Sequence, residues 1–406
     1  MSRPELPAAA AVDAPRTDDT HVDDAAASVA PVLTDGVVTL RAHDLGDVDA
    51  LLEQCTDPEM LRFTTVPHGY TREMAVDRVA QVRADWQQPG ADRSWAIEWT
   101  PEGGSPRYAG TVDLRPGESP ATASLGFALH PAARGHGLMA RAVRLVARFA
   151  FDTRPWGVPV TRLHWRAVVG NWGSRRVAWS CGFTFHGSLP QTHVDPADRT
   201  GPALDAWHAS LGPDDALAPG APWVVPPVLD GDGIRLRPWR DDDGAALEPR
   251  GDDPQHWMPG RSVLSAATFA TWLTVRRERM SLGQAVEWCV ADASTDRALG
   301  SVVLFSRDGA IGDTAELGYQ LNPGARGRGV ATQAARLAVA YALRAEGDGG
   351  LGCGRLVAET AADNAASNRV LESAGFTVFG RERKVDRLAD GSWGDGLHWE
   401  LVPPTR

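Results

Sequence analysis

The sequence predicts two copies of one α+β (α/β) domain, each a mixed, twisted β-sheet with helices on both faces. Five landmarks recur in the same order along both halves of the 406-residue chain. Each half also passes between strand-like and helix-like periodicity without a steady βαβ alternation. A chain of this length is long for one compact core and suits two domains of ordinary size.

The landmarks pair across the chain at offsets between 190 and 196 residues. They are Leu40 with Leu236, Trp95 with Trp288, Gly137 with Gly329, Asn171 with Asn364, and Asp205 with Asp395. Because coincidence does not produce five ordered matches, we interpret the halves as tandem copies of one fold. Copy one is placed at residues 33–211 and copy two at residues 232–406.

The segments outside the two copies have a different composition. Residues 1–32 are rich in Ala, Pro and Asp and contain no aromatic residue. Such a segment cannot bury enough apolar surface to offset its ordering entropy, which predicts a disordered tail. Residues 212–231 are rich in Pro and Gly, which predicts a linker between the copies.

The central elements follow the same order in each copy. Polar and apolar positions alternate over residues 124–130 and 316–322, as they do in strands. Apolar residues then recur at helical spacing over 138–151 and 330–344. The next strands are expected at 163–169 and 355–361.

Composition excludes several functional classes. The chain has 41 Lys plus Arg against 52 Asp plus Glu, a formal net charge of −11, whereas general nucleic-acid binding needs a basic face. Its four cysteines show no CxxC spacing, which indicates neither a zinc ribbon nor a disulfide framework. No apolar run approaches the roughly 18 residues of a membrane span, and no apolar signal core is present at the N-terminus. We therefore expect a cytoplasmic protein without nucleic-acid or membrane partners.

A turn rich in Arg and Gly joins the strand to the helix in each copy. It reads Arg134-Gly135-His136-Gly137 in copy one and Arg326-Gly327-Arg328-Gly329 in copy two. A helix N-terminus presents unpaired amides and a positive partial charge, glycine allows close backbone approach, and arginine adds donors suited to phosphate. The alternative is an ordinary helix start with a solvated arginine, but recurrence in the same context favours a phosphate site.

Other phosphate-binding motifs fit less well. The P-loop pattern GxxxxGK[ST] is absent from the sequence. The segment from Gly135 to Ala140 matches the dinucleotide pattern GxGxx[GA], but it lies deep within its domain rather than after the first strand. We treat that match as accidental.

Together with the N-x-x-S…G-F segments that start at Asn171 and Asn364, these turns resemble the GNAT acetyltransferase superfamily. More narrowly, they resemble its branch that acetylates the N-termini of ribosomal proteins. The resemblance covers all of the chain except the tail and the linker. It implies a mixed sheet splayed at its middle, binding of acetyl-CoA or another short acyl-CoA with its pyrophosphate on the turn, direct acyl transfer to an amine, and no metal.

The resemblance also implies which residues bind the cofactor. In copy two they are Arg326, Gly327, Arg328, Gly329, Val330, Ala331 and Asn364; in copy one they are Arg134, Gly135, His136, Gly137, Leu138, Met139 and Asn171. Met139 replaces the usual small residue, a change that the ribosomal branch accepts. The alternative role for the two asparagines is to cap the following helix, and one residue can do both.

Acetyl transfer needs a base for the amine and a proton donor for the leaving thiolate. The family often places a Glu on the strand before the turn and a Tyr or Ser on the later helix. Copy two has Glu316 and Ser367 at these positions, whereas copy one has Ser124 and Ser174. The alternatives are a solvated strand residue for Glu316 and a hydroxyl bonded to its own backbone for each serine.

Two further details bear on the chemistry of copy one and on the acceptor. The usual Tyr site holds Ala178 in copy one and Leu371 in copy two, so a tyrosine acid from the later helix is missing from both. His130, Asp113 and His136 are alternative bases for copy one. Trp257 and Trp272 lie where this fold places its acceptor cleft and could line an aromatic site.

The sequence therefore predicts an N-acetyltransferase that moves an acetyl or short acyl group to a primary amine. The acceptor could be a protein or peptide α-amine, an amino sugar or a small metabolite. Copy two is the stronger candidate for chemistry because it has the strand carboxylate. The main alternative is a non-catalytic acyl-CoA sensor or scaffold; another is a phosphate-binding regulatory module unrelated to CoA.

Overall fold

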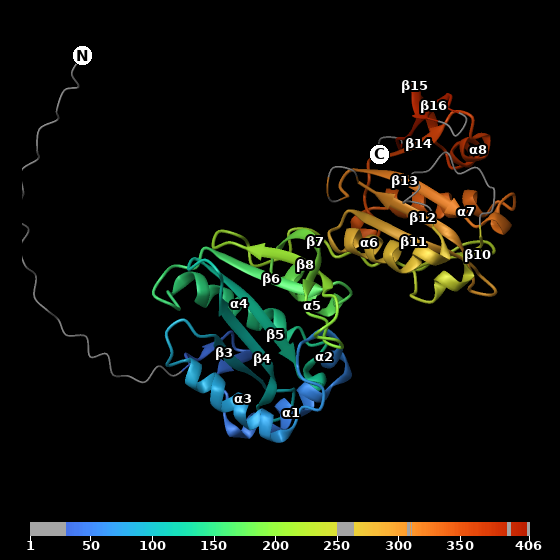
Figure 1. Ribbon diagram of the computed structural model, residues 1–406. Coiled ribbons are helices and arrows are strands. Elements are labelled where there is room, and N and C mark those ends of the chain that lie inside the picture. The colour runs from blue at the N-terminus through green and yellow to red at the C-terminus, as the bar shows by residue number, and fades with distance from the viewer. Residues whose placement is uncertain (1–29, 250–263, 307–308, 310, 388–390, 404–406) are drawn as a thin grey trace, which may run out of the picture. The chain divides into compact units, whose positions relative to one another are not determined.

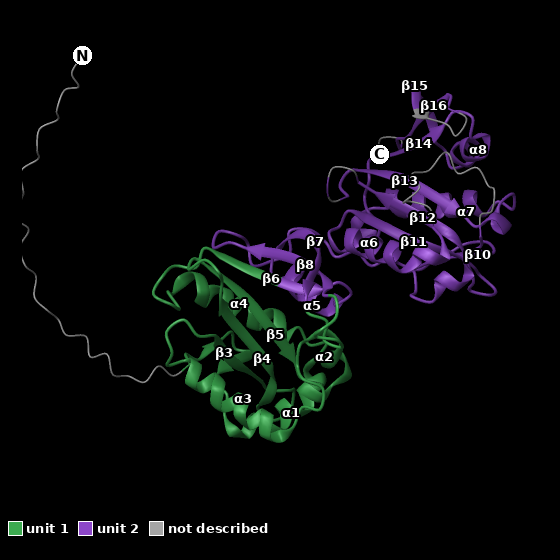
Figure 2. Cartoon of the chain, in the orientation of Figure 1, with its two compact units in different colours: residues 1–165, 194–202 green, residues 166–193, 203–406 purple. Residues whose placement is uncertain are grey.

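The computed structural model describes residues 30–249, 264–306, 309, 311–387 and 391–403 (Figure 1). The chain divides into two compact units, residues 1–165 with 194–202 and residues 166–193 with 203–406 (Figure 2). Two eight-stranded sheets run through the described chain, one for each copy of the repeat. The predicted fold class, two mixed sheets with associated helices, is confirmed.

The sheet of copy one has the strand order β1-β2-β3-β4-β5-β6-β8-β7. Its strands are β1 (Leu33–Thr34), β2 (Val38–Arg41), β3 (Arg93–Trp99), β4 (Arg107–Pro116), β5 (Thr122–Leu129), β6 (Arg162–Val168), β7 (Thr184–His193) and β8 (Leu204–Leu211). Its helices are α1 (Val48–Thr56), α2 (Pro58–Phe63), α3 (Arg72–Asp85), α4 (Leu138–Asp152) and α5 (Trp172–Ser180), with short 3₁₀ turns η1 (Leu45–Asp47) and η2 (Pro131–Ala133).

The sheet of copy two has the matching order β15-β16-β14-β13-β12-β11-β10-β9. Its strands are β9 (Leu229–Asp230), β10 (Ile234–Arg237), β11 (Ala285–Asp292), β12 (Ala298–Phe305), β13 (Thr314–Leu321), β14 (Arg355–Ala361), β15 (Thr377–Arg387) and β16 (Trp393–Leu401). Its helices are α6 (Phe269–Ser281), α7 (Val330–Leu343) and α8 (Ala365–Ser373), with 3₁₀ turns η3 (Asp243–Ala246), η5 (Ala266–Thr268), η6 (Pro323–Ala325) and η7 (Glu346–Asp348).

Alternation along the strands places helices on both faces of the sheet. In β11, Trp288 is buried in the core that α7 covers, whereas its neighbour Cys289 is buried in the core that α6 covers. The same division occurs in copy one, where Trp95 packs edge-on at 5.2 Å from Phe149 of α4 and Ala96 joins the core formed with α1 and α3. Successive strand residues point to opposite faces, so each strand serves two cores.

The sheets separate near their middle, at their parallel strand pair. In copy two, β13 and β14 pair only from Thr314 with Arg355 to Glu316 with Val357. Beyond that point β13 continues along β12, and β14 continues along β16. In copy one, β5 and β6 pair over the equivalent three residues, ending at Ser124 with His164. The described strands therefore leave unpaired backbone edges after Glu316 and Ser124.

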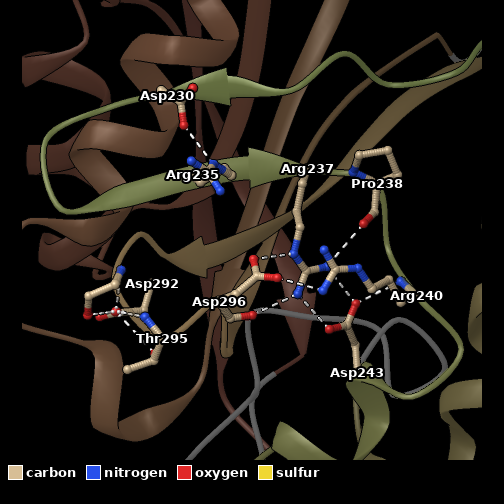
Figure 3. Close-up of polar contacts among 10 residues, drawn as sticks. Asp230, Arg235, Arg237, Pro238, Arg240, Asp243, Asp292, Thr295 and Asp296 are labelled. Carbon is tan, nitrogen blue, oxygen red and sulfur yellow. Dashed lines mark hydrogen bonds and ion pairs between the residues drawn. The ribbon is translucent and has the colours of Figure 1, made fainter.

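The repeated Leu-Arg landmark has a structural cause. Arg237, at the end of β10, is 3% exposed and donates two hydrogen bonds to the carboxylate of Asp243 at 2.8 and 2.7 Å. Its Nε donates to Asp296 at 2.8 Å (Figure 3). In copy one Arg41 binds Asp47 and Glu98 in the same way. Each arginine therefore uses charge-assisted hydrogen bonds to hold the 3₁₀ turn that follows its own strand, β2 or β10, close to the sheet.

The repeated tryptophans anchor the chain that precedes each copy. Trp95 Nε1 donates to the carbonyl oxygen of Pro31 at 2.9 Å, and Trp288 Nε1 donates to that of Pro227 at 2.8 Å. Ala30 is buried. Residues 1–29 of the expected tail lie outside the described residues.

Unit 2 joins α5 and β8 to α6. Arg175 is 3% exposed and its guanidinium carbon lies 4.1 Å from the ring centroid of Phe185. Its Nε donates to Ser281 Oγ at 3.0 Å, while Trp207 Nε1 donates to a carboxylate oxygen of Glu278. These contacts explain why the compact unit includes elements that precede the expected linker. The repeat boundaries alone do not reveal them.

Candidate active site

Both Arg/Gly turns have the geometry of an anion cradle. Gly327 and Gly329 have φ values of +70° and +79°, and a Cβ added to either would meet no atom within 4 Å. Gly329 is the N-cap of α7, and no side chain caps this helix. Because L-residues rarely adopt these φ values, glycine is required here to bring the amides forward. The first turn of α7 thus begins at a glycine with no side-chain cap, the arrangement that leaves helix amides available to an anion.

The turn of copy one is equivalent. Gly135 and Gly137 have φ values of +82° and +71°, and added Cβ atoms would again meet nothing within 4 Å. Gly137 is the N-cap of α4 and has no side-chain cap. Both turns therefore fit a pyrophosphate through their main-chain amides.

The residues predicted beside the glycines contribute in different ways. Leu138, Met139 and Val330 are buried in the core, so only their main chain can reach a ligand. Arg326 and Arg328 are exposed. Ala331 is partly buried. Their prediction as cofactor-binding residues therefore rests on the backbone of the helix start and on the exposed arginines of copy two.

Arg134 of the copy-one turn is ion-paired. Its guanidinium is held by Asp57 at 2.5 Å and by Glu59 at 2.8 Å, both from the start of α2. Burial raises the pKa of Asp57, but the hydrogen bonds from Arg134 and from the α2 amides outweigh it and lower this pKa. His136 lies beside Trp99, with ring centroids 4.8 Å apart. The turn arginine of copy one therefore belongs to an ion-pair network with two carboxylates of α2 and its N-cap.

Asn171 and Asn364 cap the helices that follow them. The side-chain oxygen of Asn364 accepts a hydrogen bond from Ser367 N at 3.1 Å, and that of Asn171 accepts from Ser174 N at 3.0 Å. The capping alternative is confirmed for both residues. A contact with the cofactor remains a prediction.

Glu316 occupies the last paired position before the strands separate. It lies opposite Phe305 of β12 and Val357 of β14. Its neighbours Ala315 and Leu317 are buried in the α7 core, so the half-buried carboxylate faces the α6 side of the sheet. The parallel pairing of β13 with β14 ends at this residue.

The α6 side of the sheet near Glu316 is polar. The guanidinium carbon of Arg279 lies 5.3 Å from the ring centroid of Phe305; burial and Arg276 lower the pKa of Arg279, which Glu287 and Glu316 partly offset. Glu287 is 2% exposed and accepts from Ser301 Oγ at 2.6 Å. Burial raises its pKa despite the nearby Arg276.

Ser124 of copy one has a different neighbour. It lies opposite Arg115 of β4, where copy two has Phe305 opposite Glu316. The guanidinium of Arg115 extends over Gly126, since a Cβ added to that glycine would come within 2.5 Å of Arg115 Nη2. A cation therefore lies beside the position where copy two has its carboxylate.

The alternative bases of copy one already have partners. Asp113 accepts from Ser94 Oγ at 2.6 Å and from Arg115 at 2.8 Å. His130 lies 3.0 Å from a carboxylate oxygen of Glu53, and its other ring nitrogen accepts from an η2 amide. Their roles as alternative bases remain predictions.

Tyr319 is a further candidate site residue, which the sequence motifs do not mark. Its hydroxyl lies 2.7 Å from Ser367 Oγ and donates to the Ser367 carbonyl oxygen at 3.1 Å. Burial raises the pKa of Tyr319 to about 12, against the opposing effect of the Ser367 hydrogen bond. The signal was the difference between the aligned strands, where copy one has Phe127.

The structure also shows the surroundings of the usual tyrosine position and of one of the two tryptophans expected near the acceptor. Ala178 and Leu371, at the usual tyrosine position, are buried core residues. Trp272 is also buried, packed at 5.4 Å from Trp239, and Trp257 lies outside the described residues. No His, Cys, Asp and Glu cluster suited to a metal ion occurs among the described residues. No helix in this part of the chain combines the length and apolarity of a membrane span.

Comparisons with known proteins identify the family. A family model described as the acetyltransferase (GNAT) domain matches residues 38–184 and again residues 234–377. The chain is 35% identical over 132 residues to the probable N-acetyltransferase YjcK of Bacillus subtilis (strain 168), an alignment that covers 32% of this chain and 70% of YjcK.

Solved structures resemble it as well. A GNAT-family acetyltransferase from Bacillus anthracis is similar with 14% identity and a TM-score of 0.38, over 45% of this chain and 98% of its own. The microcin C7 self-immunity acetyltransferase MccE, solved with acetyl-CoA and AMP, has 21% identity and a TM-score of 0.38, over 44% of this chain and 93% of its own. The two family-model matches together span more than half of the sequence; the chain belongs to the GNAT acetyltransferase family and contains two copies of its domain.

Proposed function

We propose that this protein transfers an acetyl or short acyl group from acyl-CoA to a primary amine, and that copy two performs the chemistry. The observation that carries the proposal is the position of Glu316. It is the last paired residue of β13 before the strands separate, and it precedes an uncapped, glycine-lined helix start on the same strand–turn–helix unit. We also propose residues 33–211 and 232–406 as the functional domains, with 212–231 between them.

The turn of copy two supplies the binding interactions. Amides from Arg326 to Ala331 would hold the pyrophosphate, with Arg326 and Arg328 adding charge. The unpaired edges of β13 and β14 beyond Glu316 can receive the amide groups of the extended acyl-CoA arm. Such binding places the thioester near the point where the strands part.

Glu316 supplies the base. A lysine-like amine has a pKa near ~10.4 and must lose a proton before it attacks. The carboxylate accepts this proton, directly or through a water, a role worth typically ~10²–10⁴-fold in rate. The new N–C bond forms as the C–S bond breaks, the nitrogen gives up its second proton to water as the amide forms, and the sulfur leaves as a thiolate. We assign to Ser367 the hydrogen bond to this sulfur.

A Glu316→Gln variant tests the proposal, with CoA release from acetyl-CoA measured against a panel of free peptide N-termini, amino sugars and small amines. The kcat should fall about 100-fold or more, most strongly at lower pH, where deprotonated amine is scarce. The KM for acetyl-CoA should stay nearly unchanged. Glu372→Gln removes an exposed carboxylate of α8 and should keep wild-type rates. Wild-type turnover of Glu316→Gln from pH 6 to pH 9 would remove Glu316 from the mechanism.

A second role is favoured for copy one by the residues around Ser124. The turn suits acyl-CoA, but Ser124 stands where copy two has Glu316, and the neighbouring Arg115 is ion-paired with Asp113 at 2.8 Å and with Asp92 at 3.6 Å. We infer that copy one binds acyl-CoA as a sensor or scaffold and contributes little to turnover. The acceptor is proposed as a protein or peptide N-terminus or a small amine. YjcK, named a probable N-acetyltransferase, supports the amine class.

A further inference from the structure

Tyr319 and Ser367 form a hydrogen-bonded pair from segments far apart in sequence. Tyr319 lies on β13, three residues beyond Glu316, where β13 has lost its pairing with β14. Ser367 lies in the first turn of α8, and its amide is held by the Asn364 cap. The hydroxyl pair, at 2.7 Å, therefore links the free stretch of β13 to the helix that follows β14.

The pair has two hydrogen-bond arrangements, because a phenol has one proton. When Tyr319 donates to the Ser367 carbonyl oxygen, its own oxygen accepts the serine proton. When Tyr319 donates to Ser367 Oγ, the serine proton is released toward another acceptor. Both acceptors lie within hydrogen-bond distance of the phenol, at 3.1 and 2.7 Å. Rotation of two hydroxyl protons is enough to exchange the arrangements.

We propose that Tyr319 is a positioning residue that directs the Ser367 hydroxyl proton toward the sulfur of CoA in copy two. This inference rests on the proposed function of that site. As the C–S bond breaks, its electron pair moves to sulfur, and Ser367 donates a hydrogen bond to the charge that develops there. The serine hydroxyl then no longer donates to the Tyr319 oxygen. Tyr319 instead donates its own proton to Ser367 Oγ, so the two hydroxyl groups stay hydrogen-bonded. Donors preorganised toward developing charge are effective in this role.

No proton leaves Tyr319 in this scheme. A phenol with a pKa of about 12 stays protonated beside a thiol group, whose usual pKa is ~8.5. The thiolate takes its proton from water after the amide has formed, and the amine proton passes through Glu316. Tyr319 thus stabilises charge through Ser367 without being consumed.

Copy one provides an internal contrast. Phe127 stands at the equivalent place on β5, and its ring has no hydroxyl. The same strand also carries Ser124 instead of Glu316. Copy one therefore lacks both the carboxylate and the phenol, whereas it keeps the phosphate turn. The two losses on one strand agree with a copy that binds the cofactor without using its thioester.

The thiol pKa of bound CoA tests the inference without knowledge of the acceptor. It is followed by thiolate absorbance as pH is raised, with CoA bound to a Gly137→Val chain so that only copy two is loaded. Adding Tyr319→Phe should raise this thiol pKa by about 1 unit, the equivalent of one hydrogen bond to a charged group. Ser367→Ala should raise it as much or more, and Tyr319→Phe should add nothing further in that background.

Tyr341→Phe is the matched control, because Tyr341 is buried in the same core on α7 and should leave the thiol pKa unchanged. CoA affinity should stay within about twofold in all variants. An unchanged thiol pKa in Tyr319→Phe, or full additivity with Ser367→Ala, would overturn the inference. Ser367→Ala keeps Tyr319 in place, so an unchanged thiol pKa there refutes the proposal even if Tyr319→Phe folds poorly.

The kinetics separate this inference from the proposed function. If Glu316→Gln keeps wild-type turnover, the catalytic assignment fails, whatever the thiol pKa shows. If Glu316→Gln loses turnover but Tyr319→Phe changes neither kcat nor the thiol pKa, only the role of Tyr319 falls. With an active acceptor, Tyr319→Phe should lower kcat about tenfold with little change in either KM.

Discussion

One strand in each copy carries the residues that separate the copies chemically. On β13, Glu316 is the last residue paired with β14, and the Tyr319 hydroxyl lies 2.7 Å from Ser367 Oγ. On β5, Ser124 stands beside the Arg115 guanidinium. These substitutions leave the strand's pairing unchanged, so they alter chemistry without altering the fold. Binding and turnover can therefore diverge between copies of one domain.

At the same scale, His43 predicts a pH-dependent stability of unit 1. It is 3% exposed, and neither ring nitrogen has a hydrogen-bond partner. Burial lowers its pKa from 6.5 to about 4, partly offset by Asp47 and Asp113. Between these values the unfolded chain binds the extra proton, so the free energy of unfolding should fall as pH drops from 6.5 to 4. The full loss is about 3 kcal/mol.

A His43→Phe variant should flatten this dependence. Urea unfolding at pH 7 and at pH 4.5 measures it, and the wild type should lose clearly more stability than the variant. The aromatic replacement is reasonable because copy two has a buried Trp239 at the equivalent position. Equal losses in both proteins would show that His43 does not carry the effect.

At the level of elements, the sequence predicted the strand–turn–helix unit closely. The helices expected at 138–151 and 330–344 are α4 (Leu138–Asp152) and α7 (Val330–Leu343), because apolar residues recur at helical spacing through both segments. The strand expected at 355–361 is β14. The local sequence pattern is sufficient to predict the limits of a helix or strand when residues within that element determine where it begins and ends.

Contacts between distant elements could not be predicted in the same way. Tyr319 and Ser367 are 48 residues apart, and neither side chain alters the local periodicity. The packing of α5 on α6 through Arg175 is likewise a property of tertiary structure. The candidate base and the phosphate turns could be predicted from the sequence, whereas the hydrogen bond between Tyr319 and Ser367 could be identified only in the structure.

The glycine turns predict two cofactor sites per chain. Calorimetry with acetyl-CoA should show two sites in the wild type. Gly137→Val and Gly329→Val should each weaken one site at least tenfold, because a branched side chain fits neither the positive φ nor the approach of a phosphate. Gly349→Val is the control for backbone strain, since Gly349 has a φ of +77° and open space. Unchanged affinity in Gly329→Val would refute the assignment of the turn.

At the scale of the whole molecule, we propose that copy two carries out acyl transfer and that copy one binds acyl-CoA. Both have a splayed sheet and an uncapped helix start, which suits both for acyl-CoA. Only copy two has a carboxylate at the end of the parallel strand pair.

The rate of CoA release in the presence of an active amine, compared between Gly137→Val and Gly329→Val, tests this division most directly. We expect Gly329→Val to abolish turnover, because it disables the copy that contains Glu316, and Gly137→Val to keep most of the wild-type rate. If Gly137→Val abolishes acetylation while Gly329→Val leaves it intact, the catalytic copy has been assigned to the wrong half of the chain.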